Sequence, residues 1–570
     1  MRYTQTNVVT DRPWRVASTA PPAALSAYPS LIQRLLVGRG IQTEAQARAF
    51  LRTEPGDHPD PRLLPDIEPA IGRILAAIAA GEPIAVYGDF DVDGITATAI
   101  LAEGLRDLGA GVIPYIPNRF HEGYGVNLPA LAGLRTRGAR LVITVDCGIS
   151  AVEELRAARE LGLDAIVLDH HEVPASGAPP AIATIDPKRP DSIYPTSDLC
   201  SGGLALRLLE ALCEAARGPL DVSRYLDLAA LATVCDMVPL TGENRELVKA
   251  GLPAIAASRR PGLRALLRLS GAAGTPPTAE TLGFRVGPRL NAAGRLDDAA
   301  DALEILMTAD PARATILAER LEQLNRRRQQ MVESATLLAS ELAAREPADA
   351  PLLLVGDPHI SRGIVGLIAT RLVEIYQRPA FVYEQGDEQC TGSARGVPGF
   401  DVVAALGSSA GLLLRHGGHR AAGGFTVETA NLEALRARLW EAAAGQFAGQ
   451  IPSSAIEVEA EAPLHALDSV TLRKLWRFAP CGVGNPNPLL LSRGVTVIER
   501  RLVGDGTHLQ MQLRDRSSSW RAIAFGRAAQ APPLGSSLDI VYAIDAGSGK
   551  YGPSLRLTDL ALSNTRGVVA

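Results

Sequence analysis

Three short apolar runs between residues 84 and 168 each end in acidic residues, and they constrain the fold more than any other feature. The runs are Ile84–Tyr87, Leu141–Val145 and Ala165–Leu168. Stretches with helical spacing separate them, which is typical of parallel strands joined by crossover helices. Open α/β sheets bind ligands at the carboxyl ends of their strands. We therefore predict an α/β fold whose parallel sheet gathers these acids along one edge.

The surrounding pattern predicts further elements. Several stretches with helical spacing begin at a polar residue or end at a glycine, which marks their limits. The predicted helices cover residues 31–37, 44–51, 67–80, 95–108, 128–137, 151–161, 201–216 and 226–234, and a further strand covers 112–116. Residues 1–28 are rich in Pro, Thr and Ala, and we expect them to form an irregular arm.

The acidic residues that end the runs crowd one another. They are Asp89, Asp91 and Asp93 after the first run, Asp146 after the second, and Asp169 with His170 and His171 after the third. Like charges about 4 Å apart, at an effective dielectric near 20, repel by roughly 4 kcal/mol. A divalent metal is the simplest positive partner. A solvated turn rich in Asp and Gly is the alternative. It explains one such ending, but it explains three in one crevice poorly.

The ligand types indicate which metal to expect. Carboxylates with imidazole, and without thiolates, favour Mn²⁺ or Mg²⁺ over a structural zinc site. Two ions ~3.5–4 Å apart would neutralise four or five acids, make hydroxide from water and clamp a phosphoryl centre. Asp146, on the middle strand end, is the expected bridging ligand. One of His170 and His171 would bind metal while the other donates to a phosphate oxygen. Asp236, after the helix at 226–234, is either a further ligand or a polar end cap.

The second half of the chain adds a basic segment, a long helix and a second α/β region. Residues 285–295 hold arginines and glycines that suit a phosphate cradle, or else form a solvated basic loop. Residues 311–345 predict one helix that joins two domains, with a coiled-coil partner as the alternative. Strands at 352–355, 380–383 and 389–394 and a helix at 364–376 follow. Residues 416–423 form either a glycine-rich phosphate site or a simple turn.

The C-terminal region predicts a small β-barrel. Short alternating runs at 494–499, 508–513, 520–525, 538–543 and 554–559 suit a Greek-key barrel, a common platform for single-stranded nucleic acid. The aromatic residues available for base stacking are Trp520, Phe525, Tyr542 and Tyr551. A net charge of −5 argues against a globally basic nucleic-acid binder, so such binding needs a local basic surface.

Cysteine usage and hydropathy indicate the compartment. The six cysteines are scattered without a Cys-x-x-Cys pair, which fits reduced, buried thiols. No run approaches the ~18 consecutive apolar residues of a membrane span. We expect a soluble cytoplasmic protein without membrane contact.

An ordered set of motifs resembles a known superfamily. Residues 88–94, 117–125, 145–148, 169–171 and 236–239 resemble the successive motifs of the DHH phosphoesterase superfamily. Residues 288–295, 392–395 and 417–419 are similar to its RecJ-type branch. Residues 479–486 resemble the segment that leads into the oligonucleotide-binding (OB) barrel of that branch. The resemblance implies an N-terminal arm with short helices (1–65), a parallel-sheet DHH catalytic domain (66–309), a connecting helix (310–346), a smaller α/β DHH-associated domain (347–450) and a C-terminal barrel of OB type (451–570).

The same resemblance implies an activity and residue roles. It implies a two-metal exonuclease, with Mn²⁺ or Mg²⁺, that degrades single-stranded DNA 5′ to 3′ to 5′-mononucleotides in repair and recombination. Asp89 and Asp91 would hold one ion, Asp93, His170 and Asp236 the other, and Asp146 would bridge them. His171 would contact the scissile phosphate. The implied substrate-binding residues are Asn118, Arg119, Arg289, Asn291, Arg295, Ser393, Arg395 and His419. The implied protein is a monomer that works with a single-strand-binding protein or a helicase.

Two positions depart from the superfamily pattern, and two other functions compete. Tyr87 stands where some members carry His, so Asp89 would take over that role. Ser361 stands where the branch often carries His, and His359 lies two residues earlier. A phosphodiesterase for short oligonucleotides or cyclic dinucleotides would use the same chemistry, but the region after residue 450 argues against it. A non-enzymatic strand binder would have lost ligands, yet every acid and imidazole is present.

Overall fold

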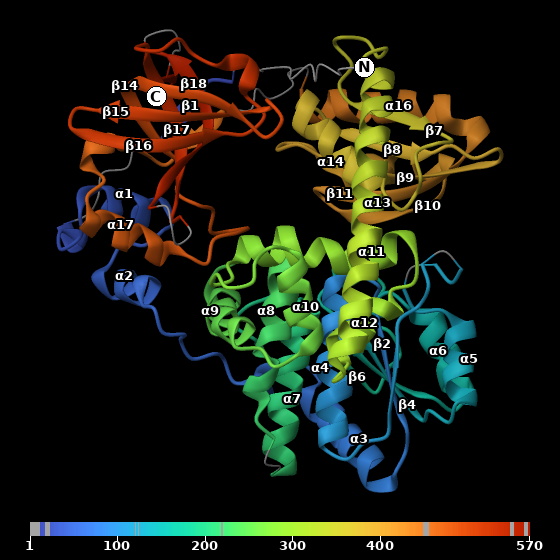
Figure 1. Cartoon of the computed structure of the whole chain (residues 1–570). Helices are drawn as coiled ribbons and strands as arrows, with labels where there is room; N and C mark the ends of the chain where they lie inside the picture. The colour runs from blue at the N-terminus through green and yellow to red at the C-terminus, as the bar shows by residue number, and fades with distance from the viewer. Residues whose placement is uncertain are drawn as a thin grey trace.

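The chain folds into three parts, which Figure 1 shows as two α/β domains stacked along a long helix and a separate β-barrel domain. The computed structural model describes residues 12–17, 23–119, 121–123, 125–217, 220–448, 455–547, 552–563 and the backbone of 568–569. The barrel and the second α/β domain lie on the same side of the first, as the red and orange ribbons show.

The first α/β domain is built on a five-stranded parallel sheet in the order β3-β2-β4-β5-β6. The strands are β2 (Ile84–Gly88), β3 (Val112–Tyr115), β4 (Leu141–Val145), β5 (Asp164–Leu168) and β6 (Ala183–Ile185). The three apolar runs are therefore the adjacent strands β2, β4 and β5, as predicted. Their side chains are almost all buried, because helices cover both faces of a parallel sheet. The three-residue strand β6 was not predicted.

Two helical layers enclose this sheet. One face is covered by α5 (Leu128–Thr136) and α6 (Val152–Glu160). The other face packs in one apolar core with α3 (Ile67–Ala80), α4 (Val92–Asp107), α7 (Ser201–Ala216), α8 (Leu226–Cys235), α9 (Gly242–Ala256), α10 (Pro261–Leu269), α11 (Gly287–Leu296) and α12 (Ala300–Met307). The alternative of a solvated basic loop at residues 285–295 is wrong, because the π-helix η4 (Thr281–Val286) and α11 cover these residues.

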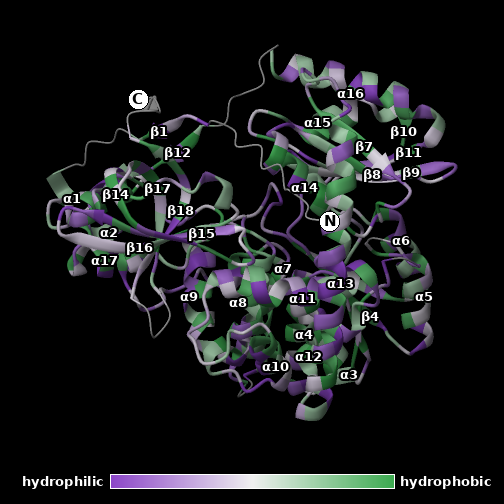
Figure 2. Cartoon of the chain, turned by 45° about the horizontal axis from the view of Figure 1, so that its top comes forward, coloured by the Kyte–Doolittle hydropathy of each residue, from purple (hydrophilic) through white to green (hydrophobic). Residues whose placement is uncertain are grey.

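A single long helix, α13 (Pro311–Ala343), joins the two α/β domains. At about 1.5 Å per residue, it spans roughly 50 Å. Leu317 and Leu321 pack into the core of the first domain, whereas Ala335 and Ala339 pack into that of the second. Figure 2 shows hydrophilic colour in the middle of the helix, between these two contacts. The helix is thus the predicted connector.

The second α/β domain has a mixed sheet in the order β10-β11-β9-β8-β7. The strands are β7 (Leu353–Asp357), β8 (Ala380–Glu384), β9 (Gln389–Arg395), β10 (Leu413–His419) and β11 (Ala422–Glu428), with helices α14 (Val365–Tyr376), α15 (Val402–Ser408) and α16 (Leu432–Gln446). The expected glycine-rich turn at 416–423 is instead mostly strand, in the antiparallel hairpin of β10 and β11. Its strands approach closely at Gly418, where a Cβ would lie 2.4 Å from the Ala422 carbonyl oxygen.

The C-terminal domain is a closed five-stranded barrel, as predicted. Its strands are β14 (Leu490–Val503), β15 (His508–Asp515), β16 (Ser518–Ala524), β17 (Ser537–Asp545) and β18 (Ser554–Leu562), and β14 pairs with β17 to close it. Tyr542 is not available for base stacking, because its ring is buried in the barrel and its hydroxyl donates to the Ala462 carbonyl. Tyr551 lies outside the described residues.

The N-terminal segment belongs to the barrel part of the molecule. Helices α1 (Ser30–Gly38) and α2 (Glu44–Leu51) share an apolar core with the barrel strands. Strand β1 (Trp14–Val16) pairs in parallel with β12 (Ile456–Val458) and β19 (Val568–Val569). The prediction of an irregular arm over residues 1–28 is therefore wrong for β1. Three-residue strands that pair across the whole chain leave no local pattern.

The barrel part is anchored to the first domain through α9. Arg245 Nη2 donates to the carbonyl oxygens of Arg477, Phe478 and Ala479 at 3.0, 3.2 and 3.0 Å. The backbone N–H of Leu240 donates to the Val483 carbonyl at 2.7 Å. Across the described parts of the chain, no helix is both long enough and apolar enough to cross a membrane. All six cysteines are free thiols, four of them buried and two, Cys235 and Cys481, partly exposed.

Candidate active site

The strand ends of the first domain bring the predicted acids and imidazoles together. Asp89 follows β2, Asp146 follows β4, and Asp169 with the two histidines follows β5, while Asp236 ends α8 from the helical layer. Three groups have ligand atoms within 4.8 Å of one another: Asp89, Asp91 and Asp146; Asp93, His170 and Asp236; and Asp146, His170 and His171. Asp146 and His170 each occur in two groups, so the five acids and two imidazoles form one continuous cluster.

Helix N-termini fix the acids of the first motif. Asp91 caps α4, because its Oδ1 accepts from the backbone N–H groups of Asp93 and Gly94 at 2.9 and 3.3 Å. Asp93 is buried, and its two oxygens accept from the N–H groups of Ser201 and Gly202, each at 2.7 Å. Those amides are the first of α7, whose dipole stabilises the carboxylate. A Cβ on Gly94 would lie 2.5 Å from the Asp89 backbone, so this turn tolerates only glycine.

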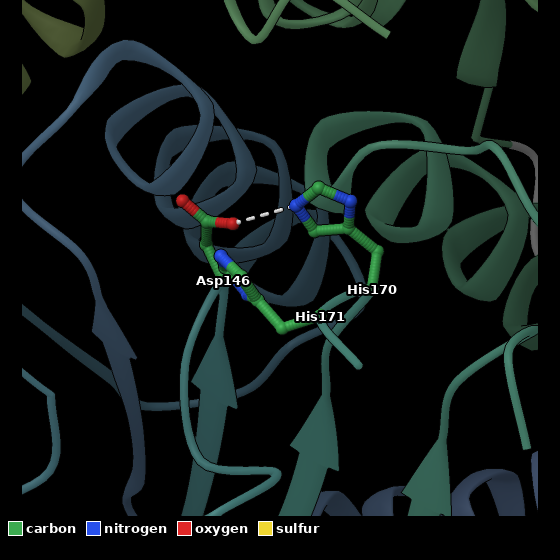
Figure 3. A group of neighbouring side chains, drawn as sticks. All are labelled: Asp146, His170 and His171. Atoms are coloured by element: carbon green, nitrogen blue, oxygen red, sulfur yellow. Dashed lines mark ion pairs between the residues drawn. The ribbon is translucent and has the colours of Figure 1, made fainter. Parts of the chain in front are cut away.

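Asp146 is held in a strained conformation at the centre of the cluster. Its φ of 62° lies in the left-handed region that non-glycine residues rarely adopt. Its Oδ1 accepts from the Ser201 hydroxyl at 3.1 Å and lies 3.2 Å from His170 Nε2. Figure 3 shows the side chains of Asp146 and His170 facing each other from neighbouring strand ends, with His171 beside them. The strain places the carboxylate between the two outer acid groups.

Asp169 orients both histidines and is not part of the three groups. Its Oδ2 accepts from the Ile149 N–H at 3.0 Å, and its Oδ1 accepts from the His170 N–H at 2.8 Å. The same Oδ1 lies 2.7 Å from His171 Nδ1. Nδ1–H therefore donates to Asp169, and Nε2 is the nitrogen left for the cavity. Burial alone would lower the pKa of His171, but the hydrogen bond and charge of Asp169 raise it above its ordinary value.

The cluster has the chemistry of a divalent-cation site. Burial, followed by the charge of the neighbouring acids, raises the pKa of Asp89, Asp146 and Asp236 well above the usual range. Burial lowers the pKa of His170 to about 3, so its ring is neutral and keeps a lone pair. Asp89 Oδ1 and His170 Nε2 are buried without a hydrogen-bond partner among the described residues. Buried acids that lack positive charge and orphaned ligand atoms fit Mn²⁺ or Mg²⁺.

Arginines from both α/β domains line the same cavity, whose volume is about 270 Å³. The lining residues are Asp89, Phe90, Asp91, Arg119, Asp146, His171, Asp236, Asn291, Arg295, Arg362, Gly363, Gly366, Ser393 and Arg395. Burial, followed by repulsion from Arg119, lowers the pKa of Arg295 to about 10. Burial also lowers the pKa of Arg119 and Arg395. These guanidinium groups face the acids across the cavity and suit a phosphate group.

The structure does not bring every predicted substrate residue into the lining. Arg289 lies outside it, in an ion pair with Glu322 of α13 at 2.7 Å. Asn118 lies outside it as well, and its backbone N–H donates to Glu122. His419 reaches the site from β10 and stacks on His171, with ring centroids 6.1 Å apart. Asn291 lines the cavity, and its Oδ1 accepts from the Val92 N–H at 3.2 Å.

The two departures from the superfamily pattern also have a structural outcome. The Tyr87 hydroxyl donates to the Gly125 carbonyl at 2.9 Å, away from the acid groups. His359 is 87% exposed and pairs with Asp357, so it lies outside the cavity lining. The Ser361 hydroxyl accepts from the Gly363 N–H at 3.4 Å, at the start of the segment that carries Arg362.

Sequence reasoning missed several residues of the site. Phe90, Arg362, Gly363 and Gly366 line the cavity. Phe90 supports Arg119, whose guanidinium carbon lies 5.0 Å from the ring centre. Arg362 and Gly363 directly follow Ser361, and their proximity to a motif position was the only available signal. Asp186 ends β6 as a fourth strand-end acid, and burial raises its pKa to about 7.

Comparison with known proteins defines first the class and then the family. The model of the DHH family, N-terminal domain, matches residues 83–233, and that of the DHHA1 domain matches residues 349–445. The model of the RecJ OB domain matches residues 458–558. The fold and its strand-end acids thus define a DHH-class phosphoesterase architecture with an added OB barrel.

Full-length relatives carry the same arrangement. The chain is 36% identical to the single-stranded-DNA-specific exonuclease RecJ of Bacillus subtilis over 94% of its own length and 68% of that protein. It is 38% identical to RecJ of Thermus thermophilus over 89% of its own length and 73% of that protein. The crystal structure of T. thermophilus RecJ with Mn²⁺ matches with a TM-score of 0.81 and 32% identity, covering 98% of this chain and 81% of that one. The chain belongs to the RecJ family.

Proposed function

We propose that this chain is a two-metal exonuclease that degrades single-stranded DNA 5′ to 3′ to 5′-mononucleotides, in repair and recombination. The observation that carries the proposal is one cavity with a buried acid and imidazole cluster on one side and the buried guanidinium groups of Arg119, Arg295 and Arg395 on the other. The relatives named RecJ are single-stranded-DNA-specific exonucleases. The 5′ to 3′ polarity follows from the family resemblance.

The acids would hold two ions, Mn²⁺ or Mg²⁺. In this assignment Asp89 and Asp91 hold one ion, Asp93, His170 and Asp236 hold the other, and Asp146 bridges them. Two such ions supply a hydroxide nucleophile and neutralise the attacking and leaving oxygens of a phosphodiester. Asp93 keeps its position through the α7 amides, and Asp146 through Ser201.

His171 and the arginines would hold the substrate. Because Asp169 accepts the Nδ1–H and raises the pKa of His171, the protonated ring can donate Nε2–H to an oxygen of the scissile phosphate. Arg119, Arg295 and Arg395 would bind the terminal 5′ phosphate, with Ser393 beside it. A cavity of about 270 Å³ has room for about one nucleotide, which favours single-nucleotide steps from an end.

The competing function, a phosphodiesterase for short oligonucleotides, would not require the barrel. Three hydrogen bonds from Arg245 of α9 and one from Leu240, just before α9, anchor the barrel part, so it is built into the catalytic part. A strand-binding domain next to the cavity supports a long single-stranded substrate. We also propose that the protein acts in the cytoplasm as a monomer, with a single-strand-binding protein or a helicase supplying its substrate.

Labelled single strands test the proposal directly. Strands labelled at the 5′ or the 3′ end, with and without a terminal phosphate, are incubated with the protein and Mn²⁺. We expect immediate release of 5′-labelled mononucleotide and a stop on addition of EDTA. Release from the 3′ end, or undiminished turnover in EDTA, would contradict the proposal. Faster turnover of a dinucleotide than of a long strand would favour the competing function.

A further inference from the structure

An exposed aromatic ring lies close to the active site. Phe284 is 79% exposed, which makes it the most exposed large hydrophobic side chain in the described part of the chain. Met237, directly after the cluster residue Asp236, is 68% exposed. Neither side chain lines the cavity. Neither side chain belongs to an apolar core of the described residues, and two such side chains in neighbouring segments are typical of an interaction surface.

The position of Phe284 follows from the packing of the π-helix η4 that carries it. The Cys235 thiol donates to the Leu282 carbonyl at 3.7 Å, and a Cβ on Gly287 would lie 2.5 Å from Cys235 Sγ. η4 is therefore packed against the end of α8, where Asp236 and Met237 lie. Helix α11 continues from η4 and brings Asn291 and Arg295 into the cavity lining. Phe284 thus lies just outside the cavity wall.

The barrel reaches the same place from the other side. Arg556 of β18 pairs with Glu280, the residue before η4, at 3.3 Å. η4 therefore lies between the cavity and the barrel. The neighbouring Arg285 is exposed and adds positive charge beside the ring. A π-helix is a rare element that occurs frequently at functional sites.

We propose that Phe284 is a platform on which one base of single-stranded DNA stacks as the strand passes from the barrel to the cavity, an inference that rests on the proposed function. Every base offers a π-face, so an aromatic platform binds a strand without reading its sequence. Arg285 supplies charge for the adjacent phosphate, and Met237 offers a deformable apolar contact beside the ring. In a duplex the bases are stacked on one another, so the platform engages only unpaired strands and contributes to strand selection.

The test compares Phe284→Ala and Phe284→Trp with the matched control Ile193→Ala, an apolar residue that is 73% exposed on the same domain. Substrates are a 5′-phosphorylated dinucleotide, which is too short to run from the cavity to the barrel, and a long single strand, both with Mn²⁺. We expect Phe284→Ala to raise KM for the long strand roughly tenfold. The value of kcat and the dinucleotide kinetics should stay unchanged. Phe284→Trp should keep the KM of the wild type, and Ile193→Ala should have no effect.

Single abasic substitutions along the long strand locate the stacked base. With the wild type, one abasic position should raise KM about as much as Phe284→Ala does, and that position should have no further effect in the Phe284→Ala variant. An active wild type whose KM for the long strand is unchanged by Phe284→Ala would overturn the inference alone. Equal losses on both substrates, or failure of Trp to replace Phe, would also overturn it. A wild type that leaves single-stranded DNA intact in Mn²⁺ would overturn the proposed function.

Discussion

The two walls of the cavity carry opposite charges and are built in different ways. The acid wall comes from one domain, and burial raises the pKa of its carboxylates. The arginine wall comes from two domains, and burial lowers the pKa of Arg119, Arg295 and Arg395. Each wall therefore lacks counter-charge. The cavity therefore has a place for cations and a place for a phosphate side by side.

The largest expected effect comes from breaking the acid wall at its centre. Asp146→Ala removes the carboxylate that belongs to two of the three groups, so we expect kcat on single-stranded DNA to fall by more than about 10³-fold, beyond the loss of a single electrostatic donor. Initial rates in Mn²⁺ measure it. Asp164→Ala is the control, because Asp164 lies at the amino end of β5, away from the cluster at the carboxyl ends of the strands, and pairs with Arg73. Rates within twofold of each other for the two variants would contradict the account.

Breaking the arginine wall should affect binding more than chemistry. Arg395→Lys keeps the charge but loses the planar fork that grips a phosphate. We expect KM for 5′-phosphorylated strands to rise roughly ten- to hundredfold, the worth of one charge-assisted hydrogen bond, while 5′-hydroxyl strands change little. Arg415→Lys on β10 of the same sheet is the control, since Arg415 is exposed. Equal losses with both strand types would show that Arg395 does not recognise the terminal phosphate.

Asp169, which orients the histidines, should affect the chemical step more than binding. Asp169→Asn keeps the size of the side chain but removes the charge that holds His171. Loss of a supporting partner of this kind costs roughly ten- to hundredfold, and we expect it in kcat with KM unchanged. Glu172→Gln is the matched control, because Glu172 is exposed and pairs with Lys188 on the surface. A higher KM with an unchanged kcat would assign Asp169 to substrate binding instead.

The smallest effect is thermodynamic. A site that binds ions only in the folded state gains about 2.7 kcal/mol at a hundredfold excess over Kd, so Mn²⁺ should raise the melting temperature by a few degrees. Because the folded-state pKa of Asp93 is raised to about 6, protons compete with the ion below that pH. The shift should be full above neutral pH and fade as the pH falls through 6. A pH-independent shift, or the same shift in Asp146→Ala, would contradict this.

Much of the acid wall was readable from the sequence, whereas much of the arginine wall was not. Asp89, Asp146 and His170 each follow a local apolar run, so strand order alone places them together. Arg362 and Gly366 reach the cavity only because α13 positions the second domain over the first, which no local pattern encodes. Arg289 looked like a phosphate ligand from its motif, but the helical phase of α11 directs it toward Glu322.

The fold shows the same division. Long apolar segments such as α3 and α7 were predicted to the residue, because helical periodicity delimits them and a glycine stops α3. The sequence of residues 416–423 leaves a phosphate site and a simple turn open, since the glycines of the β10–β11 hairpin hide the alternation of a strand. Helix α11 begins with Gly287 and Pro288, which resemble a loop but are compatible with a first helical turn. Strand β1 depends on partners at the far end of the chain.

The most direct test of the account is an anomalous diffraction map of crystals soaked in Mn²⁺. The account predicts two peaks ~3.5–4 Å apart, both within bonding distance of Asp146, with one beside Asp89 and the other beside His170. A single peak, or peaks that leave Asp146 without a metal contact, would contradict the claim that this carboxylate joins two ions in one phosphodiester-cleaving site.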